Sequence, residues 1–267
     1  NQSCENSNSA TILWTMGNGQ TFTTENIANY QYPGGGTFNV TMAVTNVCGT
    51  DDVTKVITVL PPATANATLS APRICAGQTV TFTQNSTNAN SYTWSVTPSS
   101  GVSFVQPTNS NSPAPVIRLN NAGTYNIRMR VNGCGSPEQN FTVEVVAPAS
   151  VNIGTLPDAC ASSSSVVMMP TASIGGSSPT IAWEFPGGTP GTASGANPGA
   201  VTYTAGGTYI VTATASNFCG TATDRDTFVI ALAATAAFTA SATNLCGPDE
   251  VLVLTNTSTN GGDYTWT

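Results

Sequence analysis

The sequence predicts an all-β chain of tandem two-sheet sandwich domains, and three observations support this. A segment with Gly-Thr, an aromatic residue, an alternating strand and Cys-Gly occurs three times, at residues 35–49, 122–135 and 206–220. Four tryptophans, each at the end of a short apolar run, recur at intervals of 80, 89 and 83 residues: Trp14, Trp94, Trp183 and Trp266. No stretch shows a 3.6-residue apolar period. A repeat of about 85 residues corresponds to one small β domain.

This period divides the chain into two complete repeats and two partial ones. The expected boundaries are 1–60, without its N-terminal strands, 61–147, 148–232, and 233–267, without its C-terminal strands. The connections "PPATA" (61–65), "APAS" (147–150) and "ALAATA" (231–236) are short, and none is rich in glycine. Because such joints leave little slack, we expect the domains to form an extended rod.

The second repeat shows the expected strands most clearly. We predict strands at 78–82, 91–96, 115–120, 124–131 and 139–146, and the third repeat matches at 208–215 and 226–232. In the segment 124–131, period two puts one apolar set on one face and one polar set on the other. The inward set is Tyr125, Ile127, Met129 and Val131, and the outward set is Asn126, Arg128 and Arg130.

Glycines and aromatic residues recur around this strand in the first three repeats. Gly36, Gly123 and Gly207 stand where the chain turns between sheets, which commonly needs unusual dihedral angles. We interpret the aromatic residues as structural core: Phe38, Tyr125 and Tyr209, with Trp14, Trp94, Trp183 and Trp266 beside them. An aromatic platform for sugars is the alternative, and it requires exposed rings.

These segments carry a family resemblance. "WTMGNG" (14–19), followed by "YPGGGTFNVTMAVTNVCGTDDVTKVITV", resembles a PKD domain, although Thr15 and Asn18 stand where the family hallmark has aspartates. The segment 183–220 resembles the PKD-like variant of very long Bacteroidota surface proteins, including gliding-motility adhesins exported by the type IX secretion system. "CAGQTVTFTQNST" and "CGPDEVLVLTNTST" resemble the start of the same repeat. The resemblance implies an immunoglobulin-like sandwich and a cell-surface location.

The composition argues against catalysis. There is no histidine, so a Ser-His-Asp triad, a Cys-His pair and a histidine metal site are all excluded within these residues. The 13 carboxylates are scattered, and the closest pairs lie near strand ends or hairpins: Asp51 with Asp52, Asp224 with Asp226, and Asp249 with Glu250. We interpret these pairs as solvated turn residues, and they are the best candidates for weak calcium ligands. No calcium-loop spacing is present. We therefore expect a protein that is not an enzyme and has no cofactor, with weak calcium binding left open.

Charge limits the class of partner. The net charge is -7, and Lys55 is the single lysine, so no basic stripe for nucleic acid or an anionic membrane exists. No apolar run reaches the ~18 residues that cross a bilayer. The expected partners are neighbouring repeats of the same chain, with surface glycans or other cell-surface proteins as further candidates.

Seven cysteines at regular positions predict disulfides and an extracellular environment. Strand direction brings Cys4 and Cys48 to one pole of a sandwich, as an intradomain pair. In contrast, Cys75, Cys160 and Cys246 precede the first long strand, at the pole opposite to Cys134 and Cys219. Seven strand residues separate the poles by roughly 23 Å, beyond the ~7 Å that a disulfide spans between Cα atoms.

We therefore expect an interdomain bond between Cys75 and Cys219. Cys160 would pair with a hairpin cysteine of the fourth repeat outside this sequence, and Cys134 with a cysteine that precedes it. The conventional pairs Cys75–Cys134 and Cys160–Cys219 remain the alternative, because an irregular first strand could bend a cysteine across its domain.

Two functions fit these observations. The first is a structural and adhesive repeat segment of a long extracellular surface protein, which presents a distal binding region away from the cell. The second is a set of spacer or carbohydrate-binding modules in a secreted polysaccharide-degrading enzyme. Many further repeats in the complete reading frame would favour the first, and an adjacent catalytic domain would favour the second.

Overall fold

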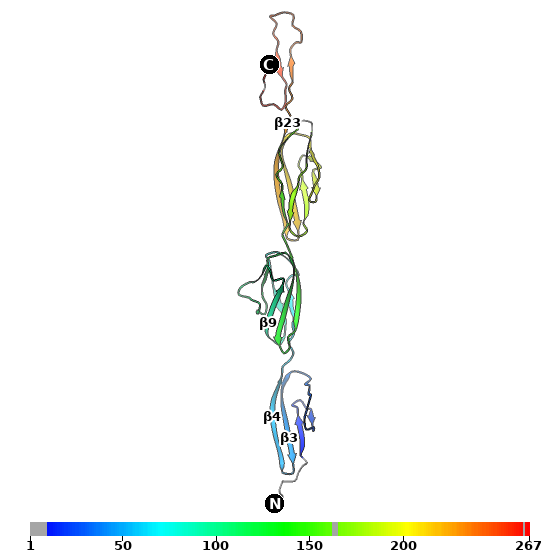
Figure 1. Ribbon diagram of the computed structural model, residues 1–267, viewed down its shortest axis with the longest axis vertical. Helices are drawn as coiled ribbons and strands as arrows, with labels where there is room; N and C mark the ends of the chain where they lie inside the picture. Colours follow the sequence, from blue (N-terminus) through cyan, green and yellow to red (C-terminus); the bar gives the residue numbers. More distant parts are fainter. Residues whose placement is uncertain (1–9, 162–164, 264) are drawn as a thin grey trace. The chain divides into compact units, whose positions relative to one another are not determined.

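The computed structural model describes residues 10–161, 165–263 and 265–267, and every regular element in this part of the chain is a β-strand (Figure 1). The prediction of an all-β chain is confirmed. The described residues gather into two compact units. The first contains those up to Pro72, with Thr79–Arg118 and Tyr125–Val143, and the second contains Arg73–Gln78, Leu119–Thr124 and the residues from Glu144 onward. None of the described residues belongs to a helix that could cross a bilayer.

The first sheet is a single layer of four strands in the order β2-β1-β3-β4. Its strands are β1 (Thr11–Thr15), β2 (Thr21–Phe22), β3 (Gly36–Asn46) and β4 (Gly49–Val59). Strands β3 and β4 pair over their full length, from Gly36↔Val59 to Asn46↔Gly49. Pairs of threonine hydroxyls face each other across this hairpin, Thr41 with Thr54 at 2.7 Å and Thr45 with Thr50 at 2.8 Å.

The next nine strands form sheets in the orders β6-β13-β12-β9, β10-β11-β7 and β5-β8. The first of these sheets consists of β6 (Arg73–Cys75), β9 (Ala89–Thr97), β12 (Gly123–Gly133) and β13 (Glu138–Val146). The others consist of β5 (Ala67–Leu69), β7 (Thr79–Val80), β8 (Phe82–Gln84), β10 (Val102–Phe104) and β11 (Ile117–Leu119).

Strand β12 shows the predicted alternation. Tyr125, Ile127, Met129 and Val131 are all at most 1% exposed, while the residues between them are exposed. The predicted strand 78–82 is instead two short strands that pair with different partners. Val80 of β7 pairs with Ile117 of β11, whereas Phe82 of β8 pairs with Leu69 of β5. The chain changes partner at Thr81, so one alternating segment contributes to two sheets.

The third group of strands repeats this plan, in the orders β15-β23-β22-β18-β20, β16-β21-β19 and β14-β17. The five-stranded sheet contains β15 (Ala159–Ala161), β18 (Thr180–Glu184), β20 (Thr192–Ser194), β22 (Gly207–Asn217) and β23 (Gly220–Leu232). The smaller sheets contain β14 (Ser150–Ile153), β16 (Val166–Met168), β17 (Ala172–Gly175), β19 (Gly188–Thr189) and β21 (Val201–Tyr203). The last two strands, β24 (Phe238–Ala240) and β25 (Leu254–Asn256), pair with each other.

The first segment of each complete repeat contributes to both of its sheets. Strand β5 pairs antiparallel with β8, and β6 then pairs parallel with β13, from Arg73↔Glu144 to Cys75↔Val146. Strand β14 likewise pairs antiparallel with β17, and β15 pairs parallel with β23, from Ala159↔Ile230 to Ala161↔Leu232. In both complete repeats, part of the first segment therefore lies parallel to the last strand of the repeat.

Aromatic residues occupy the cores of both complete repeats. Phe82, Trp94 and Phe141 form one cluster, with ring centroids 4.4 Å apart for Phe82–Trp94 and 5.1 Å for Phe82–Phe141. In the third repeat, Tyr203 lies against Tyr209 and Phe228. The indole nitrogens of Trp94 and Trp183 donate hydrogen bonds to the carbonyls of Ser112 and Gly195, each 2.9 Å away. The tryptophan rings are therefore buried, while the N–H group at the edge of each ring keeps a hydrogen-bond partner.

Two glycines show why the turn before the long strand has no side chain. Gly123 and Gly207 each begin the strand, β12 and β22, with φ of +141° and +154°. L-residues with a Cβ avoid this region, and glycine enters it without steric cost. The chain can thus turn sharply before the inward-facing Tyr125 and Tyr209, as expected from the sequence.

Candidate functional site

A disulfide between Cys75 and Cys219 is the most distinctive feature of the described residues. Its Cα atoms lie 5.6 Å apart, and the two cysteines are 144 positions apart in the sequence. Cys75 ends β6, beside Val146 at the end of β13, and Cys219 lies in the turn between β22 and β23. The bond therefore joins an edge strand of the second repeat's main sheet to the hairpin of the third, which is the pairing that strand direction favoured.

The turn that carries Cys219 is held by Asn217. The Asn217 Oδ1 atom accepts a 2.8 Å hydrogen bond from the Cys219 backbone N–H, an arrangement by which asparagine stabilises tight turns. Its Nδ2 atom donates to the carbonyls of Ala147 and Ser177, at 2.8 and 3.1 Å. One side chain thus shapes the turn and fastens the connection that follows β13.

The connection after β13 is also bonded to the turn at Ser177. The Ala147 N–H donates to the Ser177 Oγ atom at 2.9 Å, and the Ser177 N–H donates to the Ala147 carbonyl at 3.2 Å. A Cβ atom on Gly176 would lie 2.3 Å from the Pro148 carbonyl oxygen, so only glycine allows this approach. The connection is packed tightly against the third repeat.

Arg73 adds a polar contact beside the disulfide. Its Nε atom lies 3.2 Å from a carboxylate oxygen of Glu144 on the neighbouring strand β13. Its guanidinium carbon lies 4.6 Å from the ring centroid of Phe218, the residue before Cys219. The cation and the aromatic face attract each other, and the contact gives the half-exposed Phe218 a partner.

The other two connections are fastened to their downstream repeat in the same way. Asn88 donates from Nδ2 to the Pro62 carbonyl at 2.9 Å, and Asn260 donates to the Ala233 carbonyl at 3.2 Å. Both asparagines have positive φ, 55° and 61°, as does Ser178 (46°) at the matching position of the third repeat. Asparagine tolerates this left-handed conformation better than most residues. Turns before Trp94, Trp183 and Trp266 therefore hold the incoming chain by hydrogen bonds, in the third repeat together with Asn217.

The acidic pair of the third repeat binds the backbone. Asp224 accepts a hydrogen bond from the Ile153 N–H at 2.7 Å, and Asp226 accepts one from the Leu156 N–H at 2.6 Å. The second carboxylate oxygen of Asp226 accepts from the Thr227 N–H at 2.9 Å. Gln139 stands 85 residues before Asp224 and bonds both backbone groups of Ala67. These side chains hold the first segment of each repeat against its last strand.

The other two acidic pairs, candidates for weak calcium ligands, are Asp51 with Asp52 and Asp249 with Glu250. Asp51 and Asp52 are successive residues of β4, so their side chains point to opposite faces. Glu250 accepts a hydrogen bond from the Cys246 N–H at 3.0 Å, and Asp249 lies exposed beside it. In the described part of the chain, no group of three or more histidine, cysteine, aspartate or glutamate side chains could hold a metal ion.

The remaining cysteines differ in state. Cys134, Cys160 and Cys246 carry exposed free thiols. Cys48 is disulfide-bonded, and its predicted partner Cys4 lies outside the described residues. Cys160 stands beside Ala231 of β23, as Cys75 stands beside Val146 of β13. Cys134 lies at the hairpin between β12 and β13, where its carbonyl accepts a 2.9 Å hydrogen bond from the Ala63 N–H.

The predicted core aromatics fall into three groups by exposure. Trp94, Trp183 and Tyr125 are at most 3% exposed. Trp14, Phe38 and Tyr209 are half-buried. Trp266 is 54% exposed, because the pair β24–β25 has no second sheet over it among the described residues.

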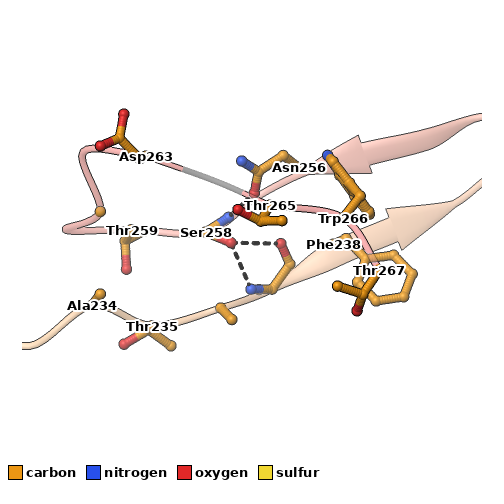
Figure 2. A pocket seen from close by; sticks show the side chains of 13 residues that line it. Ala234, Thr235, Phe238, Asn256, Ser258, Thr259, Asp263, Thr265, Trp266 and Thr267 are labelled. Atoms are coloured by element: carbon orange, nitrogen blue, oxygen red, sulfur yellow. Dashed lines mark hydrogen bonds between the residues drawn. The ribbon is translucent and has the colours of Figure 1, made fainter.

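Trp266 lines a hollow of 470 Å³ together with Phe238, Asn256 and Ser258. Figure 2 shows these side chains around the hollow, with the Ser258 hydroxyl hydrogen-bonded to the backbone of Ala237. The Phe238 and Trp266 ring centroids are 5.6 Å apart, edge to face. Since Trp94 and Trp183 at the matching position are buried, we interpret this hollow as the interior face of a repeat.

Comparison with solved structures defines the class of the fold. The I-band fragment I67–I69 from titin superposes with a TM-score of 0.52 and 15% identity, over 84% of this chain and 89% of that chain. A variant of the same titin fragment, with glutamates changed to alanines, gives 0.55 and 13% identity, over 85% and 89%. No protein-family model and no curated protein matches the sequence. The chain has the fold of tandem immunoglobulin-like domains.

Sequence reasoning identified the cysteines and missed the side chains that position them. Asn46, Asn132 and Asn217 each stand two residues before the hairpin cysteine, and this recurring Asn-X-Cys-Gly was a usable signal. Asn46 bonds the Cys48 N–H at 2.8 Å, as Asn217 does for Cys219. The roles of Arg73, Asn88 and Ser177 depend on partners distant in sequence, and no local pattern indicated them.

Proposed function

We propose that the chain is a structural and adhesive segment of a long extracellular surface protein, whose repeats hold a distal binding region away from the cell. The Cys75–Cys219 disulfide carries the proposal, because it links successive repeats covalently. Disulfides persist in oxidising compartments such as the cell exterior. A covalent link between successive repeats suits a segment that spans distance under load.

The joints support a rod with domains at 1–60, 61–147, 148–232 and 233–267. The connections at Pro62, Ala147 and Ala233 each accept an amide hydrogen bond from the repeat that follows. Joints bonded in this way restrict hinge motion. We propose that stiff joints and the disulfide act together to keep the repeats in line.

The resemblance to PKD-like repeats supports a gliding-motility adhesin type of protein, exported by the type IX secretion system of Bacteroidota. Its proposed partners are neighbouring repeats, with surface glycans or other cell-surface proteins. The alternative, a carbohydrate-binding module, finds less support, because Trp94 and Trp183 are buried and present no ring to a sugar.

Two measurements test the proposal. Antibodies against this chain should label intact cells, and disruption of type IX export should abolish the labelling; label that appears only after permeabilisation would refute the location. Small-angle scattering of the oxidised chain should give the pair-distance distribution of an elongated particle. A compact globule would refute the rod, whatever the cellular result.

A further inference from the structure

We propose that the Cys75–Cys219 disulfide removes the intervening residues from the path along which this chain transmits tension, and so caps its extension under load. The inference builds on the proposed function, since a surface adhesin works under tension. How the chain carries a load, however, depends only on its own covalent connections. A pull on a protein is carried by its shortest covalent route, and a cross-link shortens that route.

The route through the cross-link is short. Entering at Pro62, it runs along β5 and β6 to Cys75, crosses the disulfide to Cys219, and follows β23 to Leu232. The residues between the two cysteines form a closed loop off this route. They contain nearly all strands of the second repeat and all of the third except β23. Tension therefore bypasses most of both cores and runs through the core residues of β5, β6 and β23.

The loaded segments have almost no slack. A strand rises 3.2–3.4 Å per residue, close to the roughly 3.3–3.6 Å limit of a fully extended chain. Strand β23 is extended over Gly220–Leu232, and β6 is extended up to Cys75 itself. Stretching the route would straighten the short segments between strands and release little length.

Hydrogen bonds along the route resist sliding as well. Strand β23 pairs with β22 from Asn217↔Gly220 to Gly207↔Ile230 and, on its other side, with β15. Asp224 and Asp226 add bonds to the Ile153 and Leu156 N–H groups. Any pull that displaced β23 from its neighbours would have to break these bonds, which run along almost its whole length.

The experiment stretches single molecules of the full chain in optical tweezers, with handles at its two ends. In Cys219→Ser the whole chain between Pro62 and Leu232 becomes extensible. A sequence separation of 144 residues at the extended limit corresponds to about 500 Å of additional chain. We expect oxidised wild-type protein to extend by about that much less than the variant on complete unfolding.

The matched control is Cys134→Ser, which removes an exposed free thiol from the corresponding hairpin of the second repeat and should leave the extension of wild-type protein unchanged. Should Cys219→Ser fail to fold, adding reductant to a wild-type molecule already held in the tweezers gives the same comparison. Equal extension with and without the disulfide would overturn the inference. Cell labelling tests the proposed function separately, so either idea can fail alone.

Discussion

The side-chain amide of Asn217 donates a 2.8 Å hydrogen bond to the carbonyl of Ala147. The hairpin that carries Cys219 is therefore bonded to the connection that enters the third repeat. The same side chain accepts from the Cys219 N–H. Asn217 therefore links the shape of the turn, the incoming connection and the position of the disulfide cysteine. This coupling makes Asn217 the most informative single substitution at the junction.

Asn217→Ala should lower the free energy of unfolding by about 1–3 kcal/mol, the cost of leaving partly buried hydrogen-bonding groups unpaired. It should also slow re-formation of the Cys75–Cys219 bond after reduction, because the turn no longer holds the thiol in place. Urea denaturation and timed alkylation measure these two effects. Asn132→Ala is the control, since the side-chain amide of Asn132 donates a 3.1 Å hydrogen bond to the hydroxyl of the exposed Ser91. Equal effects of the two variants would contradict the assigned role.

Non-reducing peptide mapping should recover Cys75 linked to Cys219, and a thiol reagent should label Cys134, Cys160 and Cys246 in the folded, oxidised chain. A peptide that joins Cys75 to Cys134 would refute the pairing. Cys75→Ser should destabilise the chain by ~2–4 kcal/mol, the usual contribution of a disulfide. Cys134→Ser, which breaks no bond, should leave stability nearly unchanged.

Trp94→Ala should destabilise its repeat by about 3–5 kcal/mol, the cost of a cavity left by a large buried side chain. Trp266→Ala removes a half-exposed ring and should cost less. Thermal or urea unfolding measures both. If Trp94→Ala left stability unchanged and abolished binding to a glycan, Trp94 would be a binding platform and the core assignment would be wrong.

Asp226→Ala should cost about 1.5–3 kcal/mol, because it removes charge-assisted hydrogen bonds to the Leu156 and Thr227 N–H groups. Asp52→Ala, at an exposed position of β4, should change stability by no more than about 0.5 kcal/mol. Millimolar calcium should not shift the melting temperature of the wild type. A calcium-dependent rise that Asp226→Ala abolishes would instead make Asp226 a calcium ligand.

Tyr203 gives the third repeat a sensitivity to alkaline pH. Burial of the ring, with a smaller effect of Tyr209, raises the pKa of Tyr203 above its ordinary value of 10.0. A raised folded-state pKa means that the neutral form is favoured by folding. The associated stability is complete below pH 10 and is lost as the pH rises through the folded-state pKa.

Tyr203→Phe should reduce this alkaline loss, measured by urea unfolding at pH 7 and above pH 10. At neutral pH the variant should be at least as stable as wild type, since the Tyr203 hydroxyl is buried without a hydrogen-bond partner among the described residues. Tyr209→Phe, which removes a 2.8 Å bond to the Ala205 carbonyl, should cost about 1 kcal/mol. A large neutral-pH loss in Tyr203→Phe would contradict this account.

The long strands could be predicted from the sequence because their side chains alternate over many residues. Residues 124–131 and 139–146 lie within β12 and β13, and 226–232 lies within β23. The short strands could not be resolved in this way. The alternation of residues 78–82 predicts one strand, yet Thr81 marks a change of partner from β11 to β5. This change depends on distant segments.

Within the candidate site, only the disulfide was predicted from the sequence. Strand direction and the length of a strand were enough to favour Cys75–Cys219 over Cys75–Cys134. The carboxylates of Asp224 and Asp226 were interpreted as solvated turn residues or weak calcium ligands, and in the structure they hold the backbone of an edge segment. Their partners lie about 70 residues away, which no local spacing indicates.

The threonine pairs on the first hairpin have a consequence for the medium in which the protein can work. Thr41 with Thr54 and Thr45 with Thr50 connect the strands through hydroxyl groups, where many proteins use opposite charges. In the described residues the ion pairs are Arg73–Glu144 and Arg128–Glu138, both largely exposed. Dissolved salt screens charges and leaves neutral hydroxyl contacts largely unaffected. The folded state should therefore be almost equally stable in fresh and in saline water.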